Sequence, residues 1–157
     1  MEFRGYESSE FEFACNLRGL VSQEQKHEYR QRFDASGDWD GHYLDYVIDV
    51  QGIAIGEVQL RHCPKTMPPK VLEFGIEISP KFHSLGYGTQ ATISITELMF
   101  AQGFHRISGS TSTDNIAMRR VFEKSGWIHE GVLHALFLNN GRPVDYASYS
   151  KTKFQTN

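Results

Sequence analysis

An apolar strand that leads into a pair of glycines, and then into a helical pattern, constrains the fold of this chain most. Val71–Ile78 reads VLEFGIEI, and the segment Phe82–Thr89, FHSLGYGT, places Gly86 and Gly88 in the turn that follows. Two glycines between a strand and a helix let a ligand approach the backbone closely, with successive N–H groups turned outward. Because the next helix begins with a positive dipole end, this turn suits a pyrophosphate.

The glycine pair also disfavours two classes of nucleotide site. No Lys-Ser or Lys-Thr pair follows Gly88, so the turn is not a Walker loop, and the third glycine of the dinucleotide fingerprint is missing. Sites for nucleoside triphosphates and for NAD are therefore disfavoured. Since a Gly-x-Gly turn is as often structural as functional, other motifs must identify the ligand.

Length and charge indicate a single globular domain, residues 1–157, with no nucleic-acid partner. A chain of 157 residues has the usual size of one domain and buries enough surface to fold without a disulfide or a metal. Its 16 Lys and Arg against 19 Asp and Glu give a net charge of −3. Nucleic-acid modules instead concentrate basic side chains to contact phosphates.

Cysteine usage and hydropathy indicate the compartment. Cys15 and Cys63 form no CxxC pair, so neither a disulfide framework nor a zinc site is expected. His62 lies beside Cys63 but brings no further ligands, and no metal is predicted. The sequence shows no apolar signal-peptide region and no run of about 18 apolar residues. We expect a soluble cytoplasmic protein that contacts no membrane.

Hydrophobic alternation and turn signals predict a mixed order of strands and helices. A capping box at Ser22–Gln25 opens a polar helix that runs to about Phe33, and another helical stretch precedes it. Asp34–Gly41, rich in Asp and Gly, is expected to be a loop, and Asn140-Gly141 is a strong hairpin signal. Further helices are expected at Thr89–Gln102 and Asn115–Ser125, and strands at Glu2–Tyr6, Tyr43–Val50, Ile53–Arg61, Val71–Ile78, His105–Ser112, Trp127–Leu138 and Pro143–Lys151.

Three motifs in order resemble those of the GNAT superfamily of N-acetyltransferases. EFGIEISPKFHSLGYGTQA resembles the acyl-CoA-binding motif (Arg/Gln)-x-x-Gly-x-(Gly/Ala), with His83 where Arg or Gln is usual. STSTDNIAMRRVFEKSGW is similar to the second half of the family domain. EGVLHALFLNNGRPVDYASYS is similar to the C-terminal hairpin of the RimJ/RimL-type branch. The resemblance covers roughly Leu44 to Lys151.

This resemblance implies an α+β (mixed α/β) GNAT fold and an acetyl-CoA site. The expected sheet is twisted and mixed, has about seven strands flanked by about four helices, and splays between its fourth and fifth strands. Acetyl-CoA would enter this split as co-substrate, with no metal. The implied cofactor-binding residues are Gly75, Ile76, Glu77, Ile78, His83, Ser84, Leu85, Gly86, Tyr87, Gly88, Thr89, Asn115 and Phe122.

The implied reaction is direct attack of a neutral primary amine on the thioester in a ternary complex. A lysine-like ammonium, with a pKa of about 10.4, must first lose a proton to a carboxylate or a water chain. Glu73 and Glu77 share one face of the strand, because side chains alternate along it. We expect Glu73 to be the base and Glu77 to be the second choice, the alternative being that one is an ordinary salt-bridged carboxylate.

The acid that protonates the thiolate is where the sequence departs from the family pattern. Many members carry a Tyr seven residues after the Asn that matches Asn115, and this chain has Phe122 there; the branch often has Ser where Met118 stands. Tyr149 or a water would then supply the proton, or the thiolate would leave unassisted. His134, on the C-terminal hairpin, is a candidate second base.

The resemblance does not select an acceptor. A peptide or protein N-terminus, an aminoglycoside-like amine and a small polyamine all fit, and a homodimer is expected from relatives. Trp39, Tyr43 and Tyr46, flanked by aspartates, form either an acidic mouth for a cationic amine or ordinary core aromatics. Two rivals stay open: a non-catalytic acyl-CoA-binding module with a regulatory or scaffolding role, and a small-molecule sensor without a CoA site.

Overall fold

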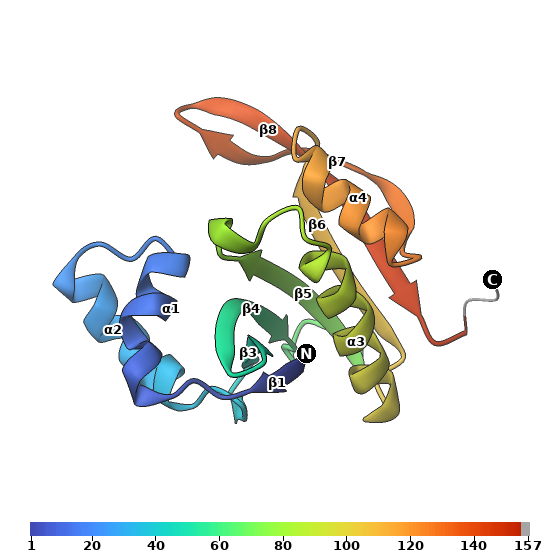
Figure 1. Ribbon diagram of the computed structural model, residues 1–157. Coiled ribbons are helices and arrows are strands. Elements are labelled where there is room, and N and C mark those ends of the chain that lie inside the picture. Colours follow the sequence, from blue (N-terminus) through green and yellow to red (C-terminus); the bar gives the residue numbers. More distant parts are fainter. Residues whose placement is uncertain (155–157) are drawn as a thin grey trace.

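The computed structural model describes residues 1–154 as one mixed sheet with four α-helices (Figure 1). The helices are α1 (Phe11–Leu17), α2 (Gln23–Asp34), α3 (Tyr87–Ala101) and α4 (Ile116–Lys124), with short 3-10 helices η1 (Ser8–Glu10) and η2 (Pro80–Phe82). The strands are β1 (Glu2–Arg4), β2 (Trp39–Asp40), β3 (Tyr43–Val50), β4 (Ile53–Arg61), β5 (Val71–Ile78), β6 (Arg106–Ser112), β7 (Ile128–Asn139) and β8 (Arg142–Thr152).

The expected α+β fold is confirmed, and so is the split in the sheet. The strand order is β1-β3-β4-β5-β6-β8-β7, with β2 paired to β3. β5 and β6 are parallel, but they pair only through Val71–Glu73, so β5 diverges from β6 toward its C-terminal end. The split lies between the fifth and sixth strands because β2, which falls within the expected loop Asp34–Gly41, adds one to the count.

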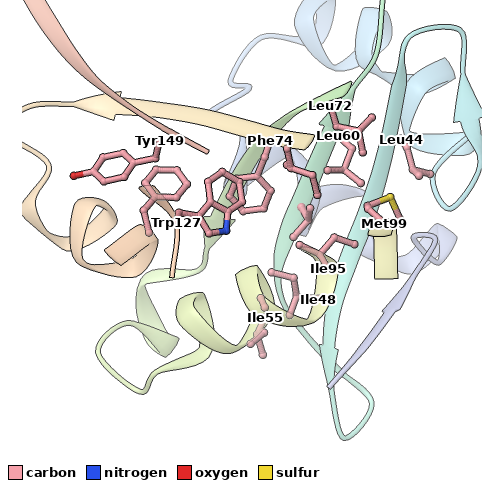
Figure 2. Packing of buried hydrophobic residues seen from close by; sticks show 14 of the residues in the cluster. Leu44, Ile48, Ile55, Leu60, Leu72, Phe74, Ile95, Met99, Trp127 and Tyr149 are labelled. Atoms are coloured by element: carbon pink, nitrogen blue, oxygen red, sulfur yellow. The ribbon is translucent and has the colours of Figure 1, made fainter. Parts of the chain in front are cut away.

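One face of the sheet packs against α3 and forms the main core. Leu60 and Leu72 from the sheet and Ile95 and Met99 from α3 are fully buried there (Figure 2). Thr92, like Thr96 one turn later, lies within α3 although β-branched residues weaken helices. Each hydroxyl donates to the carbonyl four residues earlier, which satisfies it inside the helix.

The opposite face of β3, β4 and β5 is charged and is covered by α1 and α2. Figure 1 shows this helix pair on the other side of these strands from α3. The pair has its own small core of Ala14, Cys15, Tyr29 and Phe33, separate from the main one. Its ion pairs with the sheet are formed by Arg18 and Arg32.

The C-terminal hairpin forms as expected. β7 and β8 pair antiparallel, and Asn140 and Gly141 both have positive φ, as a tight hairpin turn requires. The register between β7 and β8 shifts twice along β7, and irregularities of this kind bend a strand and increase its twist. Within residues 1–154, no helix has the length and apolarity needed to span a membrane.

Candidate active site

A cavity of about 520 Å³ lies where β5, the glycine turn and α4 meet. It collects ten of the thirteen residues predicted to bind the cofactor: Ile76, Glu77, Ile78, His83, Ser84, Gly86, Tyr87, Gly88, Thr89 and Asn115. We call it the cofactor cavity. It opens beside the part of β5 that has no partner strand on the β6 side, so backbone groups there are available to a ligand.

The glycine turn exposes the first N–H groups of α3. Ser84 and Gly86 have φ of 61° and 84°, and a left-handed residue at the helix start favours glycine at position 86. No side chain within residues 1–154 caps α3, so its first-turn amides face the cavity with the positive dipole end. The His83 ring is held against the end of β5, because its Nε2 lies 2.7 Å from the carbonyl oxygen of Ile78.

Helix α4 forms one wall of the cofactor cavity and adds residues to those predicted from the sequence. The predicted residue Asn115 caps this helix, and its Oδ1 accepts a hydrogen bond from the backbone N–H of Met118 at 3.1 Å. Met118, Arg120 and Lys124 line the cofactor cavity. The four-residue spacing of Arg120 and Lys124 places both cations on one helix face, a signal that was visible in the sequence.

A second cavity, of about 650 Å³, lies on the charged face of the sheet, under α1 and α2. We call it the acceptor cavity. Its lining combines aliphatic, charged and amide side chains: Leu17, Arg18, Leu20, Gln25, Glu28, Tyr29, Arg32, Glu57, Gln59, Gly75, Ile76 and Glu77. Ile76 and Glu77 line both cavities, so the two cavities adjoin at this point of β5.

Glu77 has the properties of a base at that meeting point. Glu77 is exposed along β5, but partial desolvation of its carboxyl raises its pKa, and the nearby His83 opposes that shift to a lesser degree. Within residues 1–154 the side-chain carboxylate of Glu77 forms no ion pair and no hydrogen bond, so it is available to a substrate. A carboxyl with a raised pKa accepts a proton more readily than an ordinary one.

Of the two candidate bases, Glu73 and Glu77, it is Glu73 that forms a salt bridge. Its Oε2 accepts from Arg61 Nε at 2.7 Å and also contacts Arg61 Nη2 across β4 and β5. Both side chains are about half exposed, and Glu73 lines neither cavity. The first-choice base therefore lies outside both cavities, whereas the second choice, Glu77, lines both.

Tyr149 and Phe122 lie in the core rather than at the site. Both are about 1% exposed, and their rings stack at 4.9 Å between centroids (Figure 2 labels Tyr149). The Tyr149 hydroxyl donates to Glu123 Oε1 at 3.3 Å and accepts from Arg119 Nε at 3.4 Å. Neither lines a cavity, and neither does Leu85, which is 63% exposed.

The aromatic residues proposed to bind a cationic amine, and the candidate second base His134, also lie outside both cavities. Tyr43 packs under the guanidinium of Arg32, Trp39 packs against Phe104, and Tyr46 against Phe3. His134 pairs with Asp145 at 2.9 Å on the exposed hairpin. None of Trp39, Tyr43, Tyr46 and His134 lines either cavity. Among residues 1–154, no three His, Cys, Asp or Glu side chains gather as metal ligands.

A split mixed sheet, with a glycine turn at a helix N-terminus beside the split, is the arrangement that the resemblance to acetyltransferases implied. The sequence profile of the acetyltransferase (GNAT) domain matches residues 7–128, more than half of the chain. The chain belongs to this family, as its motifs predicted.

Individual relatives agree with that assignment. An uncharacterized N-acetyltransferase, YoaA, from Bacillus subtilis (strain 168) is 35% identical over 82 residues, which cover 52% of this chain and 46% of the relative. The match thus spans about half the length of this curated relative.

Two solved structures show the same fold. The dodecameric structure of spermidine N-acetyltransferase from Vibrio cholerae gives a TM-score of 0.78 at 21% identity, covering 97% of this chain and 93% of that chain. Ribosomal-protein-alanine N-acetyltransferase from Brucella melitensis also gives 0.78, at 15% identity, covering 97% and 99%. At such identities the likeness concerns the fold alone.

Proposed function

We propose that this protein is an N-acetyltransferase that moves the acetyl group of acetyl-CoA to a primary amine in a ternary complex. The observation that carries the proposal is that Ile76 and Glu77 line both cavities. A cofactor in one cavity and an amine in the other would bring thioester and nucleophile together at the carboxylate of Glu77. Direct transfer needs this geometry.

The residues of the cofactor cavity fit acetyl-CoA. The uncapped amides at the start of α3 suit the pyrophosphate, and Arg120 and Lys124 add positive charge on the opposite wall. The unpaired edge of β5 at Gly75–Ile78 offers backbone groups to an extended pantetheine arm. His83 is held by the Ile78 carbonyl, so we assign phosphate contact to the amides rather than to this ring.

Glu77 would take a proton from the incoming ammonium, directly or through one water. The neutral amine then attacks the thioester carbonyl carbon, and a backbone N–H near Ile76–Ile78 stabilises the oxyanion. The tetrahedral intermediate loses its second N–H proton to water, and it collapses to the amide as the C–S bond breaks and the CoA thiolate leaves. Since neither Phe122 nor Tyr149 reaches the site, solvent protonates the thiolate, whose ordinary pKa of about 8.5 makes it a fair leaving group.

The charges of the acceptor cavity favour a cationic amine. Arg18 and Arg32 are neutralised by Asp45 and Glu57, whereas Glu28 and Glu77 form no ion pair within residues 1–154. A small polyamine, an aminoglycoside-like amine and a peptide N-terminus remain the candidate acceptors. Membership in the RimJ/RimL-type branch, a cytoplasmic location and a homodimer stay predictions from the sequence.

Two measurements on the purified protein test this proposal: acetyl-CoA binding by calorimetry, and CoA thiol release with n-butylamine, 1,4-diaminobutane, spermidine, glycine and an alanine-initiated peptide. We expect binding and release, with kcat/KM about fivefold higher for the diamine than for glycine, since one added charge contact is worth about 1 kcal/mol. Binding without release from any amine would favour the non-catalytic module, which the buried Tyr149 and Phe122 make the second candidate. Absence of both would favour the sensor without a CoA site.

A further inference from the structure

A largely buried ion pair forms part of the wall of the acceptor cavity. Glu57 on β4 is 5% exposed, and its Oε1 lies 2.7 Å from Arg18 Nη2. Its Oε2 accepts from Arg18 Nε at 3.1 Å and from the hydroxyl of Tyr6 at 3.0 Å. A carboxylate this deeply buried stays ionised only where a cation and hydrogen-bond donors compensate it. Arg18 is the cation in contact with it.

Glu57 is also the direct cross-strand neighbour of Glu77. The antiparallel register of β4 and β5 pairs these two residues, and both side chains line the acceptor cavity. Directly opposite residues point to the same face, with Cβ atoms about 4.5–5.5 Å apart. Carboxylates that lie close together compete for a proton, because ionising one raises the pKa of the other.

We infer that Arg18 is a positioning residue for acetyl transfer: it fixes and neutralises Glu57, so that Glu77 alone takes the proton of the amine. This inference rests on the proposed function, in which Glu77 is the base. Arg18 directly follows α1 and reaches Glu57 from 39 residues earlier in the chain, so the α1–α2 region supplies both a cavity wall and the countercharge of Glu57.

Other charges also face Glu77 but do not substitute for Arg18. Arg32 is engaged with Asp45, at 2.8 Å between Nη2 and Oδ1. Arg18 itself also reaches Asp45, at 3.1 Å. The remaining charged or titratable groups that share a cavity with Glu77 are Glu28 and Tyr29 on α2, His83 and Tyr87 at the glycine turn, and Arg120 and Lys124 on α4.

The test is a carbon-13 NMR titration of the Glu57 and Glu77 side-chain carboxyls in the full chain. In Arg18→Met, we expect the higher apparent pKa of the Glu57–Glu77 pair to rise by about one pH unit, because one compensating charge is lost. In Glu57→Gln the sign reverses: Glu77 keeps the cation and loses the neighbouring anion, so its pKa falls. The double variant should return Glu77 to within about 0.3 unit of the wild-type value.

Arg4→Met is the matched control. Arg4 forms the same kind of ion pair, with Glu10 and Asp49 at 2.8 Å, but lines neither cavity. We expect it to leave the Glu77 titration unchanged while lowering thermal stability. In the profile of kcat/KM against pH for acetyl transfer, the acidic limb of Arg18→Met should shift to higher pH, in step with the pKa measured by NMR. A purely structural role of Arg18 would not produce this shift.

The outcomes separate this inference from the proposed function. An active wild type whose Glu77 titration is the same in Arg18→Met and Glu57→Gln overturns the inference and leaves the transferase intact. Since Glu57→Gln keeps the hydrogen-bond acceptor of Glu57, its predicted fall in pKa remains testable if Arg18→Met fails to fold. The titration needs no substrate, so a wild type that acetylates no amine would refute the proposed function without altering the NMR result.

Discussion

Two neighbouring residues on β4 show how differently the faces of the sheet are used. Leu60 is fully buried against α3 in the main core, while Gln59 points the other way and lines the acceptor cavity. The α3 face is closed by apolar side chains. The α1–α2 face is held by ion pairs through Arg18 and Arg32, and a cavity of about 650 Å³ remains beneath it.

This contrast indicates that one face of the sheet stabilises the fold and the other binds substrate. Apolar packing at the density of an organic crystal leaves no room for a substrate, but it supplies most of the stability. Buried ion pairs add little net stability, yet they fix two elements at a defined distance. We therefore expect substitutions on the α3 face to affect folding and those on the α1–α2 face to affect the reaction.

The largest effect is expected for Glu77→Gln. Removing the base should lower kcat/KM for the best amine by about 10²–10⁴-fold with little change in stability, because Glu77 forms no ion pair within residues 1–154. Glu73→Gln is the matched control on the same strand face, and we expect it to change kcat/KM less than about threefold, since Arg61 engages that carboxylate outside both cavities. Equal losses in the two variants would contradict the assignment of Glu77.

Leu60→Ala should have the largest effect on stability. Truncating this fully buried side chain is expected to lower the free energy of unfolding by about 2–5 kcal/mol in urea denaturation. Gln59→Ala, one residue earlier and on the cavity face, should cost less than about 1 kcal/mol. A comparable loss in the two variants would show that both faces stabilise the fold alike.

Alanine substitutions at two glycines, Gly56 on β4 and Gly75 on β5, should have smaller and unequal effects on stability. A methyl group at Gly56 would overlap the carbonyl oxygen of Glu77 and lie 2.9 Å from Ile78 Cδ1, so Gly56→Ala should destabilise by about 1–3 kcal/mol. At Gly75 the nearest atom is Gln59 Cβ at 3.9 Å, and Gly75→Ala should be neutral in thermal unfolding. The reverse order of melting temperatures would refute the close approach of β4 to β5.

The smallest effect concerns the pH dependence of stability. Burial raises the pKa of Glu57 above its ordinary 4.5, so the folded state holds an extra proton above pH 4.5 and stability falls as pH rises through that window. Hydrogen bonds from Arg4 lower the pKa of Asp49 below 3.8, so its stabilisation is present above 3.8 and is lost as pH falls through the folded pKa.

Denaturation at several pH values measures both effects. Glu57→Gln should gain stability relative to the wild type as pH rises above 4.5, because its amide does not ionise. Asp49→Asn should be less stable than the wild type at neutral pH, and the gap should close in acid. Parallel curves for either variant and the wild type would contradict the corresponding pKa direction.

Much of the fold could be predicted because it rests on local signals. The bounds of β3, β4 and β5 agree with those predicted, since turn residues flank each alternating run. The glycine turn and the start of α4 followed from Gly86, Gly88 and Asn115. The two-residue strand β2 was wrongly predicted as loop, because its pairing to β3 depends on the sheet rather than on Trp39 and Asp40.

The site was less predictable because its chemistry depends on distant contacts. Alternation placed Glu73 and Glu77 on one face, but only the cross-strand position of Arg61 distinguishes them. Arg18 meets Glu57 across 39 positions, a separation that no local pattern encodes. Tyr149 was a candidate acid from its residue type alone, and its burial depends on how β8 packs beside α4.

The central claim is that two cavities meeting at Ile76 and Glu77 hold acetyl-CoA and the amine at the same time. Initial-rate kinetics with both substrates varied tests this claim most directly. A ternary complex predicts that double-reciprocal lines for different amine concentrations intersect. Parallel lines would indicate that acetyl-CoA leaves its acetyl group on the protein before the amine binds, and would contradict the claim.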